Sequence, residues 1–374
     1  MNRFILAPDS FKGTMTANEV CDIWEASILH HIPNARISRM PVADGGEGMV
    51  DAYLRILGGE RITACVSGPF GKKMNADYAI LPDHTAVMEM AACAGLPLVG
   101  EEKDPLRAST YGVGELLIHA ADRGVKKVLL GLGGSATNDC GMGMAAALGY
   151  RFFDTAGFLL EPLAINMCRV AHIEQPEHAF SFTVTAACDV DNPLYGPSGA
   201  TYTYGMQKGA AGETLALLDA GLLNMAAVIL RDLGEDIALL PGAGAAGGLG
   251  AGVAAFLHGS LTPGIELLLD AAGFEHMLQE ADCVLTGEGR IDWQSAHGKV
   301  PVGIASRAKK HGIPVIALCG SIGDGMEVVY EHGITAVFSA VRTAADFASI
   351  QKTCHDDMRL LCDAVMRLLC MQRI

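Results

Sequence analysis

The chain has 374 residues, and its 27 Lys and Arg against 42 Asp and Glu give a formal net charge of −15. A chain this acidic repels nucleic acids and anionic membrane surfaces, so we expect neither as a partner. Half of the residues are hydrophobic, but no uninterrupted apolar run reaches the roughly 18 residues that a membrane-spanning helix needs. Polar residues follow the apolar residues 4–7 too early for a signal peptide, so we expect a cytoplasmic protein.

The 11 cysteines form neither CxxC pairs nor clusters with histidine. Several of them, including Cys188, Cys283 and Cys319, stand within apolar segments typical of buried strands. Scattered cysteines of this kind are more typical of reduced, buried thiols than of disulfides or a zinc site.

The first residues predict alternating strands and helices. Residues 4–7 and 37–40 have the apolar character of short strands. Thr16 and Glu19 have the spacing of a capping box, which predicts that a helix starts there. The buried face of this helix is expected to hold Val20, Ile23, Trp24 and Ile28. Another helix is expected from about Met49, which gives the β-α-β-α order typical of a parallel sheet.

The pattern changes near residue 62. From there to about residue 90, short alternating strands are separated by Gly and Pro, which predicts antiparallel hairpins. Beyond these hairpins we expect helices at 112–123, 142–148 and 213–233, and strands at 128–130 and 182–187. A second glycine-rich run at 241–252 precedes another expected helix.

The strand and helix alternation returns after residue 274. Strands are expected at 283–286, 314–319 and 335–339, and helices at 301–311 and 344–370. Because the two ends of the chain share this alternation, we expect an α/β fold in which residues 1–61 and 275–374 form one discontinuous domain. Residues 62–274 then form a second α/β domain inserted into it.

A glycine-rich loop at residues 131–141 is the most informative segment. It follows an apolar strand pattern and precedes a helix of small residues, an arrangement that points several backbone N–H groups at one spot. Gly133 and Gly134, with the hydroxyls of Ser135 and Thr137, therefore suit a bound phosphate. A tight turn without a ligand is the alternative interpretation.

Further polar or glycine-rich segments follow predicted strands, at residues 9–13, 44–48, 189–192 and 287–292. Ligands of open α/β sheets bind outside the carboxyl ends of the strands, so these segments predict a cleft between the two domains. Phosphoryl transfer needs a phosphate cradle, carboxylates for a metal, cations and a base. All of these residue types occur in the segments.

Single clusters also have interpretations that need no ligand. Asp44 and Glu47 suit the N-cap of a helix. Asp189 and Asp191, with Asn192, offer oxygen ligands for Mg²⁺, but they also suit an Asx-turn before a proline.

Two further segments have structural alternatives of the same kind. Glu288 and Asp292 stand near Arg290 and Lys299, which suits a structural network of salt bridges. For most glycines of the run 242–252, close packing of a helix against a strand is the favoured role.

Read as whole motifs, six segments resemble the bacterial glycerate kinase family and occur in the family's order along nearly the whole chain. They are residues 7–13, 41–48, 131–139, 188–194, 285–292 and 298–301. The resemblance implies two α/β domains, one of them discontinuous and Rossmann-like, with the active site in the cleft between them. It implies ATP-dependent phosphorylation of D-glycerate to 2-phosphoglycerate, in the catabolism of sugar acids or glyoxylate.

The resemblance also suggests roles for single residues. Gly133, Gly134, Ser135 and Thr137 would bind the phosphates of ATP. Lys12, with Ser10, Arg290 and Lys299, would bind glycerate or the phosphoryl group in transfer. Asp189 would accept the proton of the attacking hydroxyl, because it ends a strand and its pattern predicts less exposure than that of Asp191. Asp44, Asp191 and Glu288 are the candidate ligands of Mg²⁺.

Two positions depart from the family pattern and concern the detail of substrate binding. Met49 stands where a threonine is usual, and Trp293 with Ser295 replaces a smaller residue with threonine.

Rival functions fit less well. A nicotinamide-dependent dehydrogenase would need GxGxxG, but Ala136 occupies the third glycine position. The galactokinase and homoserine kinase group lacks the segments 9–13 and 285–292. A non-enzymatic sensor on the same scaffold differs only in activity, and an oligomer is compatible with the sequence.

Overall fold

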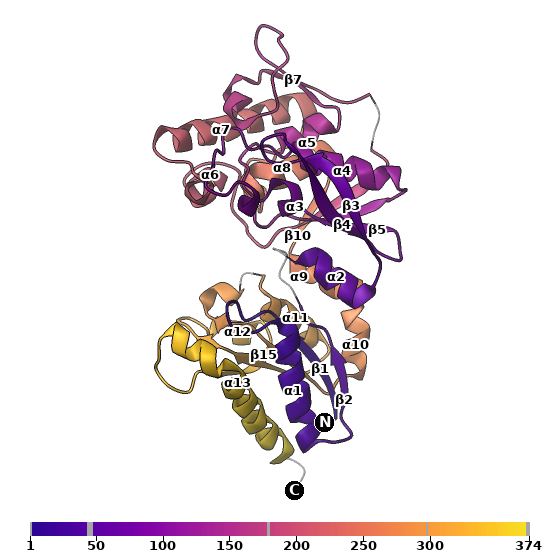
Figure 1. The fold of residues 1–374 in the computed structure, drawn as a ribbon, viewed down its shortest axis with the longest axis vertical. Coiled ribbons are helices and arrows are strands. Elements are labelled where there is room, and N and C mark those ends of the chain that lie inside the picture. The colour runs from indigo at the N-terminus through magenta and orange to yellow at the C-terminus, as the bar shows by residue number, and fades with distance from the viewer. Residues whose placement is uncertain (1, 43–47, 178–179, 297, 372–374) are drawn as a thin grey trace. The chain divides into compact units, whose positions relative to one another are not determined.

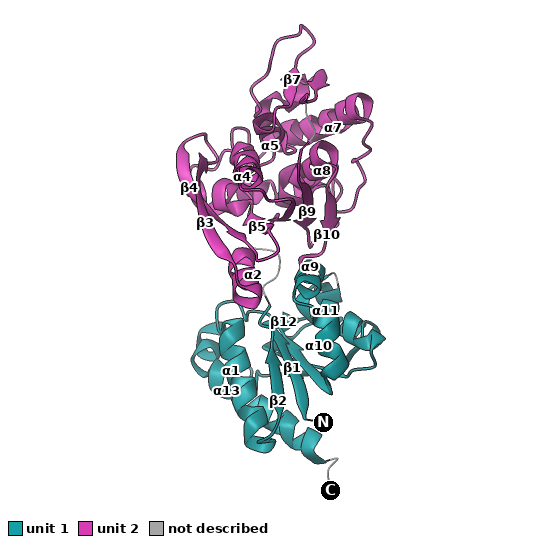
Figure 2. Cartoon of the chain, turned by 90° about the vertical axis from the view of Figure 1, so that its right-hand side faces the viewer, with its two compact units in different colours: residues 1–44, 265–374 teal, residues 45–264 magenta. Residues whose placement is uncertain are grey.

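The computed structural model describes residues 2–42, 48–177, 180–296 and 298–371. The chain divides into two units, drawn in different colours in Figure 2. Unit 1 consists of Met1–Asp44 and Ile265–Ile374, and unit 2 of Gly45–Gly264. The boundaries therefore lie at 44/45 and 264/265, whereas the sequence pattern places them at 61/62 and 274/275.

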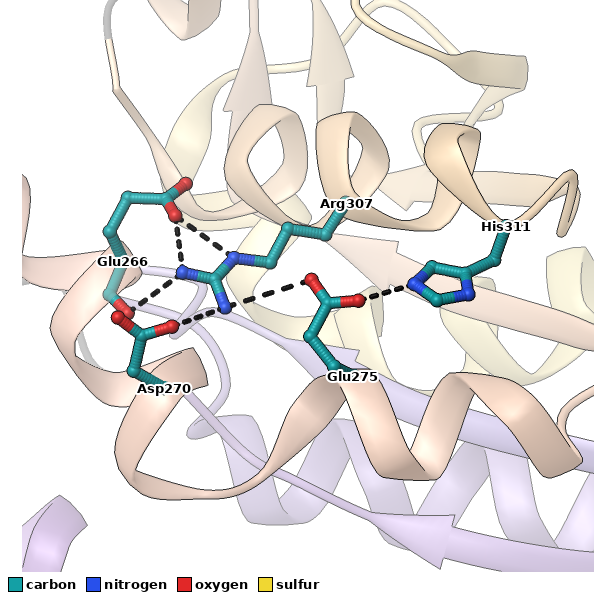
Figure 3. A network of polar contacts seen from close by, with 5 residues as sticks. All are labelled: Glu266, Asp270, Glu275, Arg307 and His311. Atoms are coloured by element: carbon teal, nitrogen blue, oxygen red, sulfur yellow. Dashed lines mark hydrogen bonds and ion pairs between the residues drawn. The ribbon is translucent and has the colours of Figure 1, made fainter.

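Contacts at the two boundaries explain this difference. At the first, the N–H groups of Gly48 and Met49 donate to Glu89 Oε1, so the helix that begins there belongs to unit 2. At the second, Arg307 binds the helix that follows Gly264 (Figure 3). Its guanidinium donates to Glu266 Oε2 at 2.9 Å and to Asp270 Oδ1 at 2.6 Å.

Unit 1 contains a sheet of five parallel strands in the order β15-β13-β11-β1-β2. The strands are β1 (Arg3–Pro8), β2 (Arg36–Arg39), β11 (Cys283–Gly287), β13 (Val315–Cys319) and β15 (Ile334–Ser339). The central strands are buried along almost their whole length, as parallel strands covered on both faces are. A short pair, β12 (Arg290–Ile291) and β14 (Ser321–Ile322), follows two of these strands.

Helices cover both faces of this sheet (Figure 2). The helices of unit 1 are α1 (Ala17–His31), α9 (Gly264–Ala271), α10 (Phe274–Glu280), α11 (Val300–Lys310), α12 (Val328–Glu331) and α13 (Phe347–Cys370), with a 3₁₀ turn at Trp293–Ala296. On one face, α1 and α13 pack together, and Trp24 and Met358 join Phe4 and Leu6 of β1 in one apolar cluster. The predicted capping box of α1 is confirmed, since Glu19 N donates to Thr16 Oγ1 and Thr16 N to Glu19 Oε2.

Unit 2 contains a six-stranded sheet in the order β10-β9-β6-β5-β4-β3. The strands are β3 (Glu60–Ser67), β4 (Lys73–Ile80), β5 (Thr85–Glu89), β6 (Lys127–Gly131), β9 (Thr183–Ala187) and β10 (Ser260–Thr262). The predicted antiparallel hairpins are confirmed for β3, β4 and β5, while β5, β6, β9 and β10 are parallel. Glu89, Gly131 and Ala187 are paired in register, so three carboxyl ends meet at one edge.

The other elements of unit 2 surround this sheet (Figure 1). The helices are α2 (Met49–Leu57), α3 (Ala91–Ala94), α4 (Tyr111–Asp122), α5 (Met142–Ala147), α6 (Ala200–Tyr204), α7 (Glu213–Leu233) and α8 (Ala245–Leu257). Three 3₁₀ turns, at Leu96–Leu98, Ala164–Arg169 and Met206–Lys208, and the hairpin of β7 (Arg151–Phe153) and β8 (His172–Glu174) complete the unit.

Helix α7 has the bounds that the sequence predicts. It is the one helix among the described residues that is long and apolar enough to cross a membrane. Leu218, Leu222, Met225 and Ile229 of this helix are fully buried in the core of unit 2. The apolar character of α7 is thus explained by its place in the core.

Helix α8 begins inside the second glycine run, whereas the sequence pattern places a helix after it. The predicted close packing by these glycines is found, but the neighbour of the helix is the first glycine loop and not a strand. A Cβ on Gly247 would lie 2.0 Å from Thr137 O, and one on Gly252 would lie 2.8 Å from Cys140 O. The glycines therefore let α8 lie directly against the first glycine loop.

Candidate active site

The first glycine loop leaves β6 at Gly131 and is held by backbone hydrogen bonds on two sides. Leu96 N donates to Gly134 O at 2.8 Å, and Ala136 N donates to Ala94 O at 2.9 Å. On the other side, Cys140 N donates to Gly247 O at 3.1 Å. The loop is consequently a fixed part of unit 2 before any ligand binds.

The end of the loop is capped by its own carboxylate, that of Asp139. This buried side chain accepts hydrogen bonds from Gly141 N and Gly143 N at the start of α5, and from both N and Oγ1 of Thr110. The sequence pattern predicts that donors at this helix start face a phosphate. That part of the prediction is wrong, because Asp139 already uses them.

The first half of the loop keeps its donors. Within the described parts of the chain, no acceptor is found for the N–H groups of Gly133, Gly134 and Thr137. Gly133 is half-buried and Gly134 is exposed, and Gly134 has a left-handed φ of 74°. Backbone N–H groups in such a turn form a concave anion-binding surface. Because Thr137 is fully buried, the donors exposed to a phosphate are those of residues 133 and 134.

Ser135 and Thr137 are buried beneath these glycines, and a lysine joins them. Lys208 Nζ donates to Ser135 Oγ and to Thr137 O, each at 2.7 Å. Only 2% of Lys208 is exposed. Burial lowers the pKa of this ammonium group to about 7, and the negative charge of Asp139 opposes the shift.

Lys208 was missed by the sequence analysis. The signal for it is weak but present, because Lys208 stands between Gln207 and Gly209 just as Lys12 stands between Phe11 and Gly13.

Two buried polar atoms beside Lys208 have no hydrogen-bond partner among the described residues: Thr137 Oγ1 and Asn138 Oδ1. The amide nitrogen of Asn138 donates to Thr201 Oγ1 at 3.2 Å. Unsatisfied polar atoms are rare in protein interiors and mark places where a water molecule or a ligand completes the bonding.

The segment after β9 begins at the same edge of the sheet as the first glycine loop, because β9 pairs with β6. Asp189 and Asp191 are both exposed, so the predicted difference in their exposure is not found. The reason is that β9 ends at Ala187, two residues earlier than Asp189. Asp189 Oδ1 accepts a hydrogen bond from Gly264 N at 2.8 Å. Asn192 is already bonded, because Tyr204 Oη donates to its Oδ1 and its Nδ2 donates to Ser198 O.

In unit 1, Glu288 follows β11 and is 7% exposed. Ser295 Oγ donates to Glu288 Oε1 at 2.6 Å, and Lys299 Nζ lies 3.5 Å from Oε2. Burial raises the pKa of Glu288, and the contacts with Ser295 and Lys299 oppose this shift. Ser295, one of the positions that depart from the family pattern, thus still offers a hydroxyl, and it donates to the carboxylate of Glu288. Nearby, Arg290 pairs with Asp292 at 3.4 Å, so the predicted salt bridges are confirmed.

The segment after β1 lies next to the segment after β11. Asp9 N donates to Gly287 O at 2.8 Å, and a Cβ on Gly289 would lie 3.6 Å from the Cα of Phe11. Ser10 is half-buried, and its N–H group donates to Asp9 Oδ1, while Lys12 is exposed. Residues almost 280 positions apart are thus neighbours because β1 and β11 pair.

Asp44, one of the predicted metal ligands, lies outside the described residues. Over the described ranges, the one cluster of three or more potential His, Cys, Asp or Glu ligands is His30, His31 and Asp363 on unit 1. Asp363 of that cluster is also bonded to Arg367, and the cluster contains none of the candidate site residues.

Each unit is thus an α/β unit with polar groups gathered at the carboxyl ends of parallel strands, an arrangement typical of enzymes that bind phosphorylated or acidic small molecules. Comparison of the chain with known proteins and protein families defines it more closely. Residues 4–370 match the glycerate kinase family, and the chain belongs to that family.

Its relatives include proteins named glycerate kinase or glycerate 2-kinase. The glycerate kinase of Halalkalibacterium halodurans is 49% identical over 352 residues, which is 91% of either chain. The glycerate 2-kinase of Escherichia coli K12 is 40% identical over 363 residues, 95% of either chain. The structure is also similar to a crystal structure described as that of glycerate kinase 2 from Salmonella typhimurium LT2. The two have a TM-score of 0.86 and 39% sequence identity, and the match covers 100% of this chain and 99% of that one.

Proposed function

We propose that this protein transfers the γ-phosphoryl group of ATP to D-glycerate and forms 2-phosphoglycerate. Membership of the glycerate kinase family supports phosphoryl transfer to glycerate from a nucleotide donor. The observation that carries the proposal is the first glycine loop, which has donors at Gly133 and Gly134 and buried hydroxyls at Ser135 and Thr137. In this function these groups bind the phosphates of ATP.

The parallel five-stranded sheet with helices on both faces supports a Rossmann-like description of unit 1. The proposal requires that residues of unit 1 and of unit 2 act on the same pair of substrates. A crystal structure with ATP and glycerate bound tests this requirement. It fails if Ser135 contacts the nucleotide while Lys12 lies far from both ligands.

The proposed reaction uses a carboxylate and several cations of this chain. The C2 oxygen of glycerate forms a bond to the γ-phosphorus, the bond from that phosphorus to the β–γ bridging oxygen breaks, and ADP leaves. Asp189 accepts the proton of the attacking hydroxyl. The position of Asp189 supports this role, because it lies two residues after β9, the strand that pairs with β6 and its glycine loop. Ser10, Lys12, Arg290 and Lys299 are the proposed ligands of the glycerate carboxylate and of the phosphoryl group in transfer.

Mg²⁺ is the metal that this chemistry implies, and it neutralises phosphate charge when it is bound. It prefers oxygen ligands and is held in such sites by one or two carboxylates together with the substrate phosphates. The exposed carboxylate of Asp191 fits that requirement. Glu288 fits it less completely, because Ser295 and Lys299 contact its two oxygens. Asp44 stays a candidate from the sequence.

Release of ADP that depends on D-glycerate is the test of this function. We expect turnover with Mg-ATP and D-glycerate, and none when the acceptor is omitted. Phosphorus NMR of the product identifies the oxygen that carries the phosphate, and we expect the C2 position. Absence of D-glycerate-dependent ADP release contradicts the proposal, and a product phosphorylated at C3 corrects its regiochemistry.

A further inference from the structure

Lys208 lies in a turn that places a cation in the interior of unit 2. The turn Met206–Lys208 stands between α6 and α7 and is followed by Gly209, whose φ is 98°. A Cβ on Gly209 would lie 2.7 Å from the Cβ of Lys103. Only glycine fits this approach and this backbone conformation, so the chain is shaped here to turn directly after Lys208.

The buried ammonium group has neutral partners. Its two hydrogen-bond acceptors are the hydroxyl of Ser135 and the carbonyl of Thr137, 73 and 71 positions away in the sequence. Among the described residues, no carboxylate lies within 4.0 Å of Lys208 Nζ. A buried cation without an ion pair is costly, because neutral dipoles replace only part of its hydration. Such a group is a strong candidate for a role in binding an anion.

The direction of these hydrogen bonds decides what Ser135 can do. An ammonium group has three donors and no acceptor, so Ser135 Oγ must accept the bond from Lys208. The hydroxyl hydrogen of Ser135 is then left to point away from Lys208. Ser135 lies one residue after the exposed Gly134, so a phosphate bound at the glycines is within reach of this hydrogen as an acceptor.

We propose that Lys208 is a positioning residue of the nucleotide-phosphate site: it fixes the segment of Ser135 and Thr137 and orients the Ser135 hydroxyl as a donor to a phosphate oxygen. The inference rests on the proposed function for the identity of the anion. The positive charge of Lys208 also attracts the triphosphate in a chain of net charge −15. Thr137 Oγ1, in the residue that Lys208 holds, is buried without a hydrogen-bond partner among the described residues, which supports a ligand-binding role for this place.

Lys208→Met tests the proposal because methionine has a similar length but neither charge nor donors. We expect the dissociation constant of Mg-ATP, measured by calorimetry, to rise about 100-fold, with a matching rise in KM for ATP. We expect KM for D-glycerate to change by less than about threefold, since the glycerate ligands proposed above lie on other segments. Lys103→Met is the matched control, because it removes an exposed lysine next to the same turn, and we expect no change in the affinity for ATP.

A double-variant cycle separates positioning from a general loss of structure. If Lys208 acts through Ser135, then Lys208→Met combined with Ser135→Ala weakens ATP binding by much less than the product of the two single effects. Independent, multiplicative effects overturn the proposed mechanism. Replacement of a buried charge by an apolar side chain is often neutral or stabilising, so we expect an unchanged melting temperature for Lys208→Met.

The pH dependence of ATP affinity gives a second test. Burial lowers the pKa of Lys208 to about 7, and Asp139 of the glycine loop is the charged group that acts on it. The exposed Lys103 packs against the neighbouring Gly209. The ammonium form is lost as the pH rises through 7, so we expect the affinity of the wild type for ATP to fall several-fold between about pH 6.5 and 8.5 relative to that of Lys208→Met. Lys103→Met keeps Lys208, so we expect its affinity to fall as that of the wild type does.

These outcomes distinguish the two proposals. If the wild type phosphorylates D-glycerate and Lys208→Met binds ATP as tightly as the wild type, the role of Lys208 is wrong and the function stands. If the wild type shows no phosphorylation but Lys208→Met binds ATP more weakly, the function is wrong and the phosphate site stands. If Lys208→Met and Lys103→Met have the same affinity for ATP and the same dependence of that affinity on pH, the inference about Lys208 is overturned.

Discussion

The segments after β6 and β9 leave neighbouring strands of one sheet edge, yet they are built in opposite ways. From Ser135 to Asp139 the first segment is buried, and its polar groups bind the rest of unit 2. The second segment exposes the carboxylates of Asp189 and Asp191. The side chain of Asn192 anchors this segment, because it is hydrogen-bonded to Tyr204 and Ser198.

The difference suggests a division of labour within the proposed site. A phosphate cradle works best when its donors are already in place, because no ordering is then needed when the nucleotide binds. A general base must come within hydrogen-bond reach of a substrate hydroxyl, and the exposed carboxylate of Asp189 is accessible to one. We therefore expect changes in the first segment to alter stability and nucleotide affinity, and changes in the second to alter turnover.

The largest effect is expected for Asp189→Asn, which tests the second segment. The asparagine keeps an oxygen that accepts from Gly264 N but cannot accept a proton. We expect kcat to fall by about 10²- to 10⁴-fold, the usual contribution of a general base, at an unchanged melting temperature. Steady-state kinetics with D-glycerate measure this. Asp189→Ala also removes the bond to Gly264, so a larger loss of stability in this variant isolates the structural part. Near-native turnover of Asp189→Asn rules out Asp189 as the base.

The next effect concerns the first segment and its buried carboxylate. In Asp139→Asn, an amide N–H₂ replaces an acceptor for the donors of Thr110 and the start of α5. Because at least one buried donor then lacks an acceptor, we expect the free energy of unfolding to fall by about 3 kcal/mol. Urea denaturation measures it.

Asp154→Asn is the matched control for this change. Asp154 accepts from Ala156 N and Phe158 N at 2.9 Å in an exposed turn. We expect a clearly smaller change in the midpoint of urea unfolding, because asparagine keeps the Oδ1 acceptor and loses only the contact of Oδ2 with the exposed Arg169. Equal effects of the two substitutions contradict the view that the first segment is a buried, preformed frame.

How far the sequence predicts this molecule depends on how local each feature is. The capping box of α1 and the bounds of α7 come from residues within one element, and both are confirmed. The start of α8 is missed because glycine has low helix propensity. The first turn of α8 is in fact irregular, because Ala246, Gly247 and Gly248 have left-handed φ values of 53°, 70° and 90°. Gly247 packs against Thr137 O in this conformation, a contact that no local sequence pattern indicates.

The site follows the same rule. The glycine loop is recognisable from its own residues, but its two strongest contacts join distant segments. Lys208 comes from 73 positions away, and Thr110 comes from 29 positions away. Such contacts exist only once the sheet and helices are assembled. That is why the sequence pattern assigned the donors at the start of α5 to a ligand and overlooked both Asp139 as their acceptor and Lys208.

A third effect comes from Lys208 and appears in stability rather than binding. Its pKa falls from 10.5 in the unfolded chain to about 7 in the fold, so the unfolded chain binds the additional proton between these values. Stability therefore rises with pH in that window, by about 1.4 kcal/mol per unit. Between about pH 7 and 8.5 we expect a rise of about 2 kcal/mol, measured by urea unfolding without nucleotide. Lys208→Met should lose this rise, whereas Lys103→Met should keep it. An identical pH profile for Lys208→Met and the wild type shows that the ammonium group is not held in a costly charged state.

The smallest effect is expected when the contact between Tyr204 and Asn192 of the second segment is removed. Tyr204→Phe removes the hydroxyl that donates to Asn192 Oδ1 at 2.7 Å and leaves the ring in place. We expect the free energy of unfolding to fall by about 1 kcal/mol, the net contribution of one hydrogen bond, and kcat to fall by less than about threefold. Tyr202→Phe, on the exposed side of α6, is the control and should change neither. A loss of turnover in Tyr204→Phe as large as that of Asp189→Asn indicates instead that the reactive segment must be held rigidly. In that case the contrast between a preformed and an exposed segment does not hold.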